Sequence, residues 1–298
     1  MQIVTTVRET QQACRNLKRR GTLGLVPTMG ALHDGHLSLV RRAQEECDAI
    51  VATIFVNPTQ FLAGEDYETY PRTFHEDCAK LEAAGVDLLF APEAGEMYLP
   101  GSTTVVEVAD VGNRLDGASR PGHFRGVATV VAKLFHIVGP DRGYFGQKDA
   151  AQIAVLRAMI RDLNFPVELV ACPIVREQDG LAMSSRNRNL TSEDRRRALI
   201  LHRALQAVSE LLEAGEIRSN ILEHALLEVF ATDERVRLDY AVIVDPDTLL
   251  PVADTARRAL IAVAAWVGST RLIDNLLTEN LPIENLYVGQ RCLEEIHG

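Results

Sequence analysis

The sequence predicts an α/β fold, in which a doubly wound parallel sheet is followed by a smaller C-terminal α+β domain. Three observations support this fold class. Strand-like and helix-like segments alternate up to about residue 175, and the strand-like segments are near-continuous apolar runs. Such runs are expected when helices cover both faces of a parallel sheet. Beyond that point, helix-like segments come first and strand-like segments follow them.

The first domain, which we expect to span residues 1–178, alternates in a regular order. Apolar runs predict strands at 23–26, 49–56, 87–91, 143–146 and 167–171. Amphipathic spacing predicts helices at 36–47, 73–84, 126–138 and 149–163. This order is typical of a Rossmann-like sheet, in which ligands bind beyond the carboxyl ends of the strands.

The second domain is expected to span residues 179–298. Residues 192–232 have a helical pattern, because Leu and Ala recur between charged positions. The strand-like segments that follow are 236–244, 259–267 and 270–275. Helices followed by a run of strands indicate a separate α+β domain, which we expect to act as a lid.

Composition limits the class of protein. The chain has 298 residues, of which 47% are hydrophobic, so it can bury a substantial core. Its net charge of -10 argues against nucleic acid or an anionic membrane as a partner. The five cysteines are widely spaced without a C-x-x-C pair, which favours a reduced, cytoplasmic protein. We identify no signal peptide and no apolar run near the roughly 18 residues of a transmembrane helix.

The most informative motif is Val-Pro-Thr-Met-Gly-Ala-Leu-His-Asp-Gly-His-Leu at 26–37, directly after the first predicted strand. His33 and His36 are spaced i, i+3, so they share one face at the start of a predicted helix. A helix N-terminus favours phosphate, and the motif is therefore a candidate nucleotide site. The alternative is a turn followed by ordinary surface histidines. We predict no metal site here, because the zincin pattern needs i, i+4 spacing with a Glu between the histidines.

Two other segments suit phosphate chemistry. Gly146-Gln-Lys-Asp149 lies between a predicted strand and a predicted helix, where its Lys can meet phosphate and Asp149 can cap the helix or hold a metal-bound water. Met183-Ser-Ser-Arg186 carries hydroxyls and a guanidinium that suit a polyphosphate. The alternatives are a solvated turn for the first segment and a flexible linker for the second.

Several polar residues elsewhere in the sequence have more than one possible role. Gln60 lies in a loop after a predicted strand, and Gln152 lies on the first turn of a predicted helix. Each amide can face a ligand or solvent. Arg120 and Arg125 flank Pro-Gly-His-Phe, where they either bring positive charge to a site or lie on the surface.

Several familiar motifs are missing from the sequence. It contains no Gly-x-x-x-x-Gly-Lys-[Ser/Thr] loop and no Gly-x-Ser-x-Gly elbow, and no Gly-x-Gly-x-x-Gly follows the first predicted strand. These observations argue against a P-loop enzyme, an α/β hydrolase and a dinucleotide oxidoreductase.

Taken together, five blocks in order resemble the pantothenate synthetase (pantoate–β-alanine ligase) family, within the wider His-x-Gly-His nucleotidyltransferase superfamily. The resemblance covers most of residues 20–190 and is weaker toward the C-terminus. Met-Ser-Ser-Arg is similar to the mobile Lys-Met-Ser-Lys-Ser loop of class I aminoacyl-tRNA synthetases. The blocks are Pro-Thr-Met-Gly-Ala-Leu-His-Asp-Gly-His (27–36), Phe-Val-Asn-Pro-Thr-Gln-Phe (55–61), Tyr-Pro-Arg-Thr (70–73), Gly-Gln-Lys-Asp (146–149) and Asp-Gly-Leu-Ala-Met-Ser-Ser-Arg-Asn (179–187).

The resemblance implies an ATP-dependent ligation in two steps. Pantoate and ATP would give pantoyl adenylate and pyrophosphate, and β-alanine would then displace AMP to give pantothenate. It also implies Mg²⁺ with ATP as co-substrate, bound mainly through phosphate oxygens and water. Members of the family are typically homodimers.

The resemblance also assigns roles to residues. It implies His36, His33 and Lys148 as catalytic residues, and Gln60 and Gln152 as ligands of pantoate, with Gln60 also near β-alanine. The residues implied to bind ATP are Met29, Gly30, His33, His36, Gly146, Lys148, Asp149, Val175, Met183, Ser184, Ser185 and Arg186.

Two positions depart from the family pattern. Many relatives have Glu where this chain has Gln147, and many have Gln where it has Ala151. We assign the pantoate contact to Gln152, the second residue of that pair. Two other hypotheses remain: a nucleotidyltransferase without a ligation step, and a non-catalytic nucleotide-binding regulator. The short chain and acidic balance disfavour an aminoacyl-tRNA synthetase.

Overall fold

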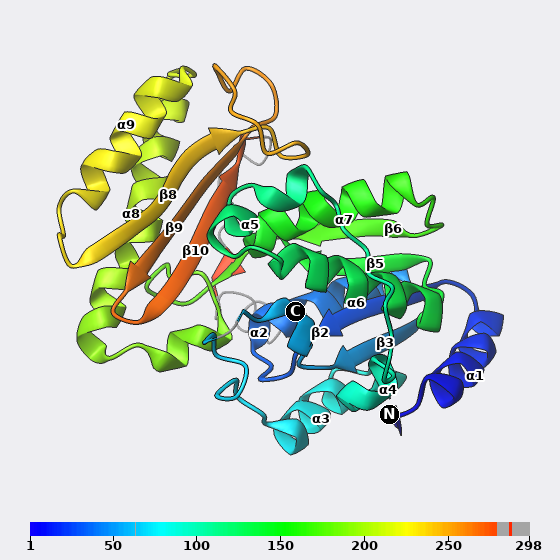
Figure 1. Cartoon of the computed structure of the whole chain (residues 1–298). Helices are drawn as coiled ribbons and strands as arrows, with labels where there is room; N and C mark the ends of the chain where they lie inside the picture. Colours follow the sequence, from blue (N-terminus) through cyan, green and yellow to red (C-terminus); the bar gives the residue numbers. More distant parts are fainter. Residues whose placement is uncertain (63, 279–285, 288–298) are drawn as a thin grey trace, which may run out of the picture. The chain divides into compact units, whose positions relative to one another are not determined.

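The computed structural model describes residues 1–62 and 64–278 and the backbone of residues 286–287. Packing divides the chain into two compact units, whose elements are labelled in Figure 1. The N-terminal unit comprises Met1–Gly146 and Ala151–Cys172, and the C-terminal unit comprises Gln147–Ala150 and Pro173–Gly298. The domain boundary expected at 178/179 stays a prediction.

Within the described part of the N-terminal unit, six parallel strands form one sheet in the order β1-β4-β3-β2-β5-β6. Strands β3, β4 and β1 lie to one side of β2, and β5 and β6 lie to the other. This confirms the predicted doubly wound sheet and places its topological switch point between β2 and β5. The strands are β1 (Gln2–Val4), β2 (Leu23–Thr28), β3 (Ala49–Ile54), β4 (Leu88–Phe90), β5 (Arg142–Gly146) and β6 (Glu168–Cys172).

Helices cover both faces of this sheet. On one face, Leu39 and Val40 of α2 pack with Val26 of β2 in a buried cluster. On the other face, Phe135 of α6 meets Phe145 of β5 edge to face, with ring centroids 6.5 Å apart. The predicted apolar strands follow from this double coverage. The helices are α1 (Val7–Leu17), α2 (Asp34–Glu46), α3 (Phe74–Ala83), α4 (Ala94–Met97), α5 (Asp116–Ser119), α6 (His123–Val138) and α7 (Ala150–Asp162).

Strand β2 is longer than predicted. The expected end at residue 26 was wrong, because Pro27 and Thr28 continue the strand and pair with β3. A central strand forms hydrogen bonds with a neighbour on each side, and proline has no N–H to donate to either neighbour. It is tolerated here because β5 pairs with β2 only at Gly24 and Leu25, before the proline. The turn that leads to the two histidines therefore begins two residues later than predicted.

Strand β1 and helix α1 were not predicted from the sequence, nor were the short elements α4, α5 and β7 (Val175–Arg176). Strand β1 has three residues and lies at the sheet edge against β4, so its apolar pattern is too short to recognise. Helix α1 has a clear signal, because Thr6 and Glu9 form a capping box. The spacing Thr-x-x-Glu could therefore have predicted this helix.

The C-terminal unit confirms the predicted α+β class. The expected helical stretch is two helices, α8 (Ser192–Glu213) and α9 (Ser219–Phe230), separated at Gly215, whose φ is +89°. Strands β8 (Val236–Val244), β9 (Leu260–Val267) and β10 (Thr270–Leu277) form an antiparallel sheet in the order β10-β9-β8. A short parallel pair joins β7 (Val175–Arg176) to β11 (Leu286–Tyr287).

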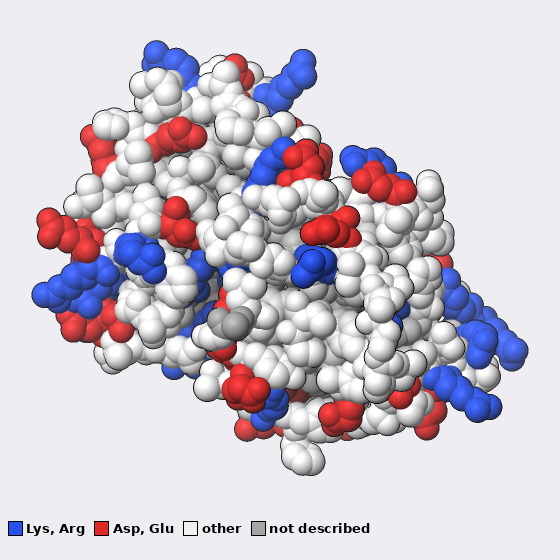
Figure 2. All heavy atoms as spheres, in the orientation of Figure 1, with Lys and Arg blue, Asp and Glu red and all other residues white. Residues whose placement is uncertain are grey.

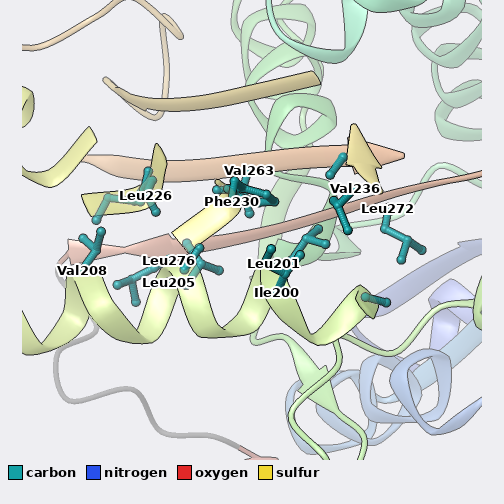
Figure 3. Close-up of a cluster of buried hydrophobic side chains, with 14 of the residues drawn as sticks. Ile200, Leu201, Leu205, Val208, Leu226, Phe230, Val236, Val263, Leu272 and Leu276 are labelled. Carbon is teal, nitrogen blue, oxygen red and sulfur yellow. The ribbon is translucent and has the colours of Figure 1, made fainter. Parts of the chain in front are cut away.

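One apolar core holds the helices of this unit to its three-stranded sheet. Side chains of α8 point toward the strands in Figure 3, and those of α9 complete the cluster. The residues labelled there are Ile200, Leu201, Leu205, Val208, Leu226, Phe230, Val236, Val263, Leu272 and Leu276.

The described residues include no helix that is both long and apolar enough to cross a membrane. Figure 2 shows basic and acidic side chains interspersed over the visible face of the molecule. That face presents no continuous basic stripe of the kind that binds nucleic acid.

A buried ion pair ties β7 to β10 in the C-terminal unit. The Arg176 guanidinium donates to both carboxylate oxygens of Asp274, at 2.6 and 3.0 Å. The two residues are 4% and 3% exposed. Removing one partner of such a pair is strongly destabilising, because the charge that remains is buried away from water.

We therefore expect Asp274→Ala to lower the free energy of unfolding by about 3–5 kcal/mol. Trp266, the single tryptophan of the chain, lies on β9, so its fluorescence during urea unfolding reports on this unit. The control is Arg235→Ala, which removes an exposed pair with Glu193 and should cost at most about 1 kcal/mol. Equal losses in the two variants would contradict the prediction.

Candidate active site

The switch point of the parallel sheet positions the His motif. Strand β2 ends at Thr28 and is followed by the turn that leads into α2, while the neighbouring strand β5 ends at Gly146. In open α/β sheets, a ligand site lies outside the carboxyl ends of the strands on either side of such a point. The motif therefore begins where the topology favours a ligand.

A strained turn connects β2 to α2. Gly30 has a φ of +85°, and Ala31 has a φ of +51°, which is unusual for a residue with a side chain. The Thr28 hydroxyl accepts from the backbone N–H of Gly30 and donates to the Thr53 carbonyl at 2.6 Å, which anchors the turn to β3. A Cβ on Gly30 would lie 3.1 Å from an Asp77 oxygen, so the position suits glycine.

Asp77 of α3 holds the second half of this turn. Its carboxylate accepts the backbone N–H groups of Ala31 at 2.9 Å and of Leu32 at 2.8 Å. The Thr73 hydroxyl donates to the same carboxylate at 3.1 Å, and Lys80 donates to the Leu32 carbonyl at 2.7 Å. Asp77 is fully buried, so these donors replace the water that an ionised carboxylate needs.

His33 and His36 stand together at the start of α2. His33 is the N-cap residue, and the two ring centroids are 4.1 Å apart with a 36° angle between the planes. The backbone N–H of His33 donates to Nδ1 of His36 at 3.4 Å. Because Nδ1 accepts, a neutral His36 carries its proton on Nε2. Both side chains are half-buried at the positive end of a helix, an arrangement that suits phosphate oxygens.

The structure brings Met29 and Gln60 together, although sequence reasoning assigned them to different substrates. Gln60 ends the short 3₁₀ helix η2 (Pro58–Gln60), which follows β3. Its amide nitrogen lies 3.2 Å from the Met29 sulfur, and its amide oxygen accepts from the Asn57 side chain at 3.0 Å.

Sequence reasoning did not identify Asn57 as a functional residue. It is 1% exposed, and its side-chain oxygen accepts from the Tyr98 hydroxyl at 2.7 Å. The block Asn-Pro-Thr-Gln was recognised, but the partner at Tyr98 lies 41 positions away and follows no pattern in the chain.

Gln152 lies on the first turn of α7 and is half-buried. Its neighbour Ala151 is 3% exposed and packs in the core. A side chain at 151 therefore faces the interior, while Gln152 keeps accessible surface. This difference supports the choice of the second position, and not the first, for a substrate contact.

In the C-terminal unit, Asn275 of β10 holds the turn that carries Lys148. Its amide nitrogen donates to the backbone carbonyls of Gln147 and Lys148, both at 3.0 Å, and its oxygen accepts from the Gln147 side chain at 3.1 Å. Lys148 also reaches Asp149 at 3.5 Å. The departure at Gln147 thus has a structural role, since this amide has the donor that a carboxylate would lack.

The Met183–Arg186 segment is hydrogen-bonded and is not simply a free linker. The backbone N–H of Met183 donates to the Val175 carbonyl at 2.9 Å, which joins two residues predicted to bind ATP. The Ser184 hydroxyl accepts from the Arg186 N–H at 3.3 Å at the start of η5 (Ser185–Asn189). Side chains 183–186 are half-buried, so their polar groups remain partly accessible.

The described residues hold no group of three or more His, Cys, Asp or Glu that could bind a metal ion.

Together, the doubly wound sheet and the imidazole pair at the helix start define a Rossmann-like, nucleotide-handling class of protein. The pantoate-beta-alanine ligase family model matches residues 2–277, and the chain belongs to this family. The resemblance stated from the sequence is thereby confirmed.

Individual relatives agree with the family match. The pantothenate synthetase of Acidobacterium capsulatum is 58% identical over 294 residues, covering 95% of this chain and 98% of the relative. That of Thermotoga neapolitana is 52% identical, covering 93% of this chain and 99% of the relative.

Solved structures show the same fold. Pantothenate synthetase from Thermus thermophilus matches with a TM-score of 0.88 at 50% identity, covering 93% of this chain and 99% of that one. Pantoate-beta-alanine ligase from Francisella tularensis, solved in complex with beta-gamma ATP and beta-alanine, matches with a TM-score of 0.73 at 33% identity, covering 94% and 98%.

The geometry around Asp77 leads to a stability prediction. We expect Asp77→Asn to destabilise the protein by about 1–3 kcal/mol, because one backbone N–H of the turn loses its acceptor. Hydrogen exchange at the amides of Ala31 and Leu32 should accelerate in the variant. The matched control is Glu76→Gln, the same chemical change at the exposed neighbouring position, which should stay within about 0.5 kcal/mol. Unchanged exchange at both amides would show that Asp77 does not hold the turn.

Proposed function

We propose that this chain catalyses the ATP-dependent ligation of pantoate and β-alanine to pantothenate, AMP and pyrophosphate. The contact between Met29 and Gln60 carries the proposal, because it places a residue assigned to the nucleotide against one assigned to pantoate. A ligase of this type must hold the acid beside the α-phosphate, whereas a protein that only binds nucleotide needs no such neighbour. Family membership and the ligands of the Francisella tularensis relative support the same conclusion.

In the first step, a pantoate carboxylate oxygen attacks the α-phosphorus of ATP. The bond from that phosphorus to the oxygen that bridges the α- and β-phosphates breaks, and pyrophosphate leaves with the electron pair of that bond. His33 and His36 are proposed to stabilise the charge that develops on the leaving group, with the Nε2–H of His36 as donor. Lys148 adds a positive charge from its turn, and we propose all three as catalytic residues.

In the second step, the β-alanine amine attacks the acyl carbon of pantoyl adenylate. The amide bond forms, the acyl–phosphate bond breaks, and AMP leaves as the amine loses a proton. We propose that Gln60 and Gln152 bind pantoate, since each amide offers both donors and an acceptor to hydroxyl and carbonyl groups. The adenylate must be kept from water, which would hydrolyse it.

We propose ATP contacts for a further set of residues. Met29 and Gly30 would contact ATP through the backbone of the turn after β2, in which Gly30 has a φ of +85°. Ser184, Ser185 and Arg186 would meet the phosphates, and Met183 is also proposed to bind ATP. The remaining residues proposed to bind ATP are Gly146, Asp149 and Val175.

We propose Mg²⁺ as the ion that accompanies ATP. The Asp149 side chain is 48% exposed, and its carboxylate is an oxygen ligand of the kind Mg²⁺ accepts, either directly or through water. When bound, the ion would neutralise phosphate charge. We also propose a homodimer, as the family resemblance implies. A cytoplasmic location is proposed from the five widely spaced cysteines, and the net charge of -10 fits a protein that does not bind nucleic acid.

The test is ATP–pyrophosphate exchange in the presence of Mg²⁺, with and without pantoate and with β-alanine left out. We expect exchange only when pantoate is present, because adenylate formation is reversible. Exchange that ignores pantoate would favour a nucleotidyltransferase with another substrate. Folded protein that binds ATP without any exchange would favour a nucleotide-binding regulator.

His36→Ala should reduce pantoate-dependent exchange by about 10²- to 10³-fold, as expected for loss of a donor to developing charge. The matched control is His136→Ala, which changes an exposed histidine on α6 and should leave exchange unchanged. Near-normal exchange by the His36 variant would refute its catalytic role.

A further inference from the structure

Helix α6 packs unusually closely against the turn that carries Gln60. A Cβ placed on Gly126 would lie 2.3 Å from the Thr59 carbonyl oxygen and 2.6 Å from the Gln60 backbone nitrogen. Real side chains do not approach backbone atoms so closely, so only glycine fits here. The backbone of η2 therefore rests directly on the backbone of α6.

The Asn57 side chain reinforces this contact. Its amide group donates one hydrogen to the Gly126 carbonyl at 3.2 Å and the other to the side-chain oxygen of Gln60 at 3.0 Å. These two bonds link the Gln60 amide to the backbone of α6 and fix its orientation relative to that helix.

His123, on the first turn of α6, holds the backbone of Gln60. Nδ1 of His123 lies 2.8 Å from the Gln60 carbonyl oxygen, and Nε2 lies 3.1 Å from a guanidinium nitrogen of Arg120. Arginine can only donate, so Nε2 accepts and Nδ1 donates to the carbonyl. Burial of the ring, with the nearby Arg120 charge, lowers the pKa of His123 to about 4, so the ring is neutral near pH 7.

Arg120 is itself fixed by Glu65. Two guanidinium nitrogens donate to the two carboxylate oxygens of Glu65, at 2.7 and 2.6 Å. Both side chains are largely buried, with 15% and 23% of their surface exposed. A bidentate pair of this kind sets the plane of the guanidinium, and through it the ring of His123.

We propose that His123 and Gly126 are positioning residues that set the orientation of Gln60 toward pantoate. The inference rests on the proposed role of Gln60 in pantoate binding. Neither residue needs to touch substrate, because each acts on the backbone or on the neighbours of Gln60. Loss of either should therefore weaken the use of pantoate while leaving the use of ATP nearly intact.

The histidine test compares three substitutions that differ in which of the two His123 hydrogen bonds they keep. In His123→Asn the amide nitrogen lies two bonds from Cβ, as Nδ1 does, so the donor to the Gln60 carbonyl is kept. In His123→Gln the amide lies three bonds away, as Nε2 does, so only the partner for Arg120 is kept. His123→Leu keeps neither. The control is His136→Asn on the exposed side of the same helix.

We expect His123→Gln and His123→Leu to raise the KM for pantoate by about tenfold to a hundredfold, with the KM for ATP within about twofold. His123→Asn should restore most of the loss. Thermal unfolding of each variant separates this pattern from a general loss of stability, which would change both KM values together and would not distinguish Asn from Gln.

Gly126→Ala tests the close approach independently. The added methyl must push η2 away from α6, so it should raise the KM for pantoate in the same selective way. The control is Gly95→Ala in α4, where a Cβ meets nothing within 4 Å and kinetics should be unchanged.

Gln60→Ala calibrates both tests. If it leaves the KM for pantoate unchanged, the assignment of Gln60 and this inference are both overturned, while pantoate-dependent exchange still decides the function separately. If it raises that KM but His123→Leu and Gly126→Ala do not, or if His123→Asn restores nothing relative to His123→Gln, the positioning inference alone is overturned.

Discussion

The buried carboxylate of Asp77 is the interaction on which the N-terminal site depends. It satisfies the N–H groups of Ala31 and Leu32, which belong to a turn that no strand or helix ladder can serve. Without an acceptor there, the positive φ of Ala31 would have nothing to offset its strain. The turn decides where α2 begins, and therefore where His33 becomes the N-cap and stacks on His36.

The same construction recurs at two other turns proposed to bind substrate, those that carry Lys148 and Gln60. A buried polar side chain from a distant element holds the backbone, and the functional side chain extends from that fixed backbone. Asn275 does this for Lys148 in the C-terminal unit, while His123 does it for Gln60 in the N-terminal unit. Turns need such partners because their N–H and C=O groups lie outside regular hydrogen-bond ladders. The result is a preorganised set of groups, which is how proteins stabilise developing charge most effectively.

Sequence reasoning reached the fold class because parallel strands covered on both faces leave a strong apolar signal, and the β8 segment was predicted with its observed bounds of Val236–Val244. It also placed the His motif at the carboxyl end of a strand. It could not reach the residues that hold the turns. Asp77 bonds to a residue 46 positions away and Asn275 to one 128 positions away, and no local spacing encodes such contacts. The roles assigned to ATP-binding side chains came from family resemblance and remain proposals.

The way the chain passes between units limits how this enzyme can be divided. Gln147–Ala150 packs with the C-terminal unit, although the residues on either side of it pack with the N-terminal unit. Asn275 therefore completes a turn that lies within the sequence of the other unit. A chimera of two relatives joined anywhere between residues 151 and 274 would combine the turn of one parent with the asparagine strand of the other. Recombination within the family should thus preserve compatibility between positions 147 and 275, and the C-terminal unit cannot be exchanged as an independent module.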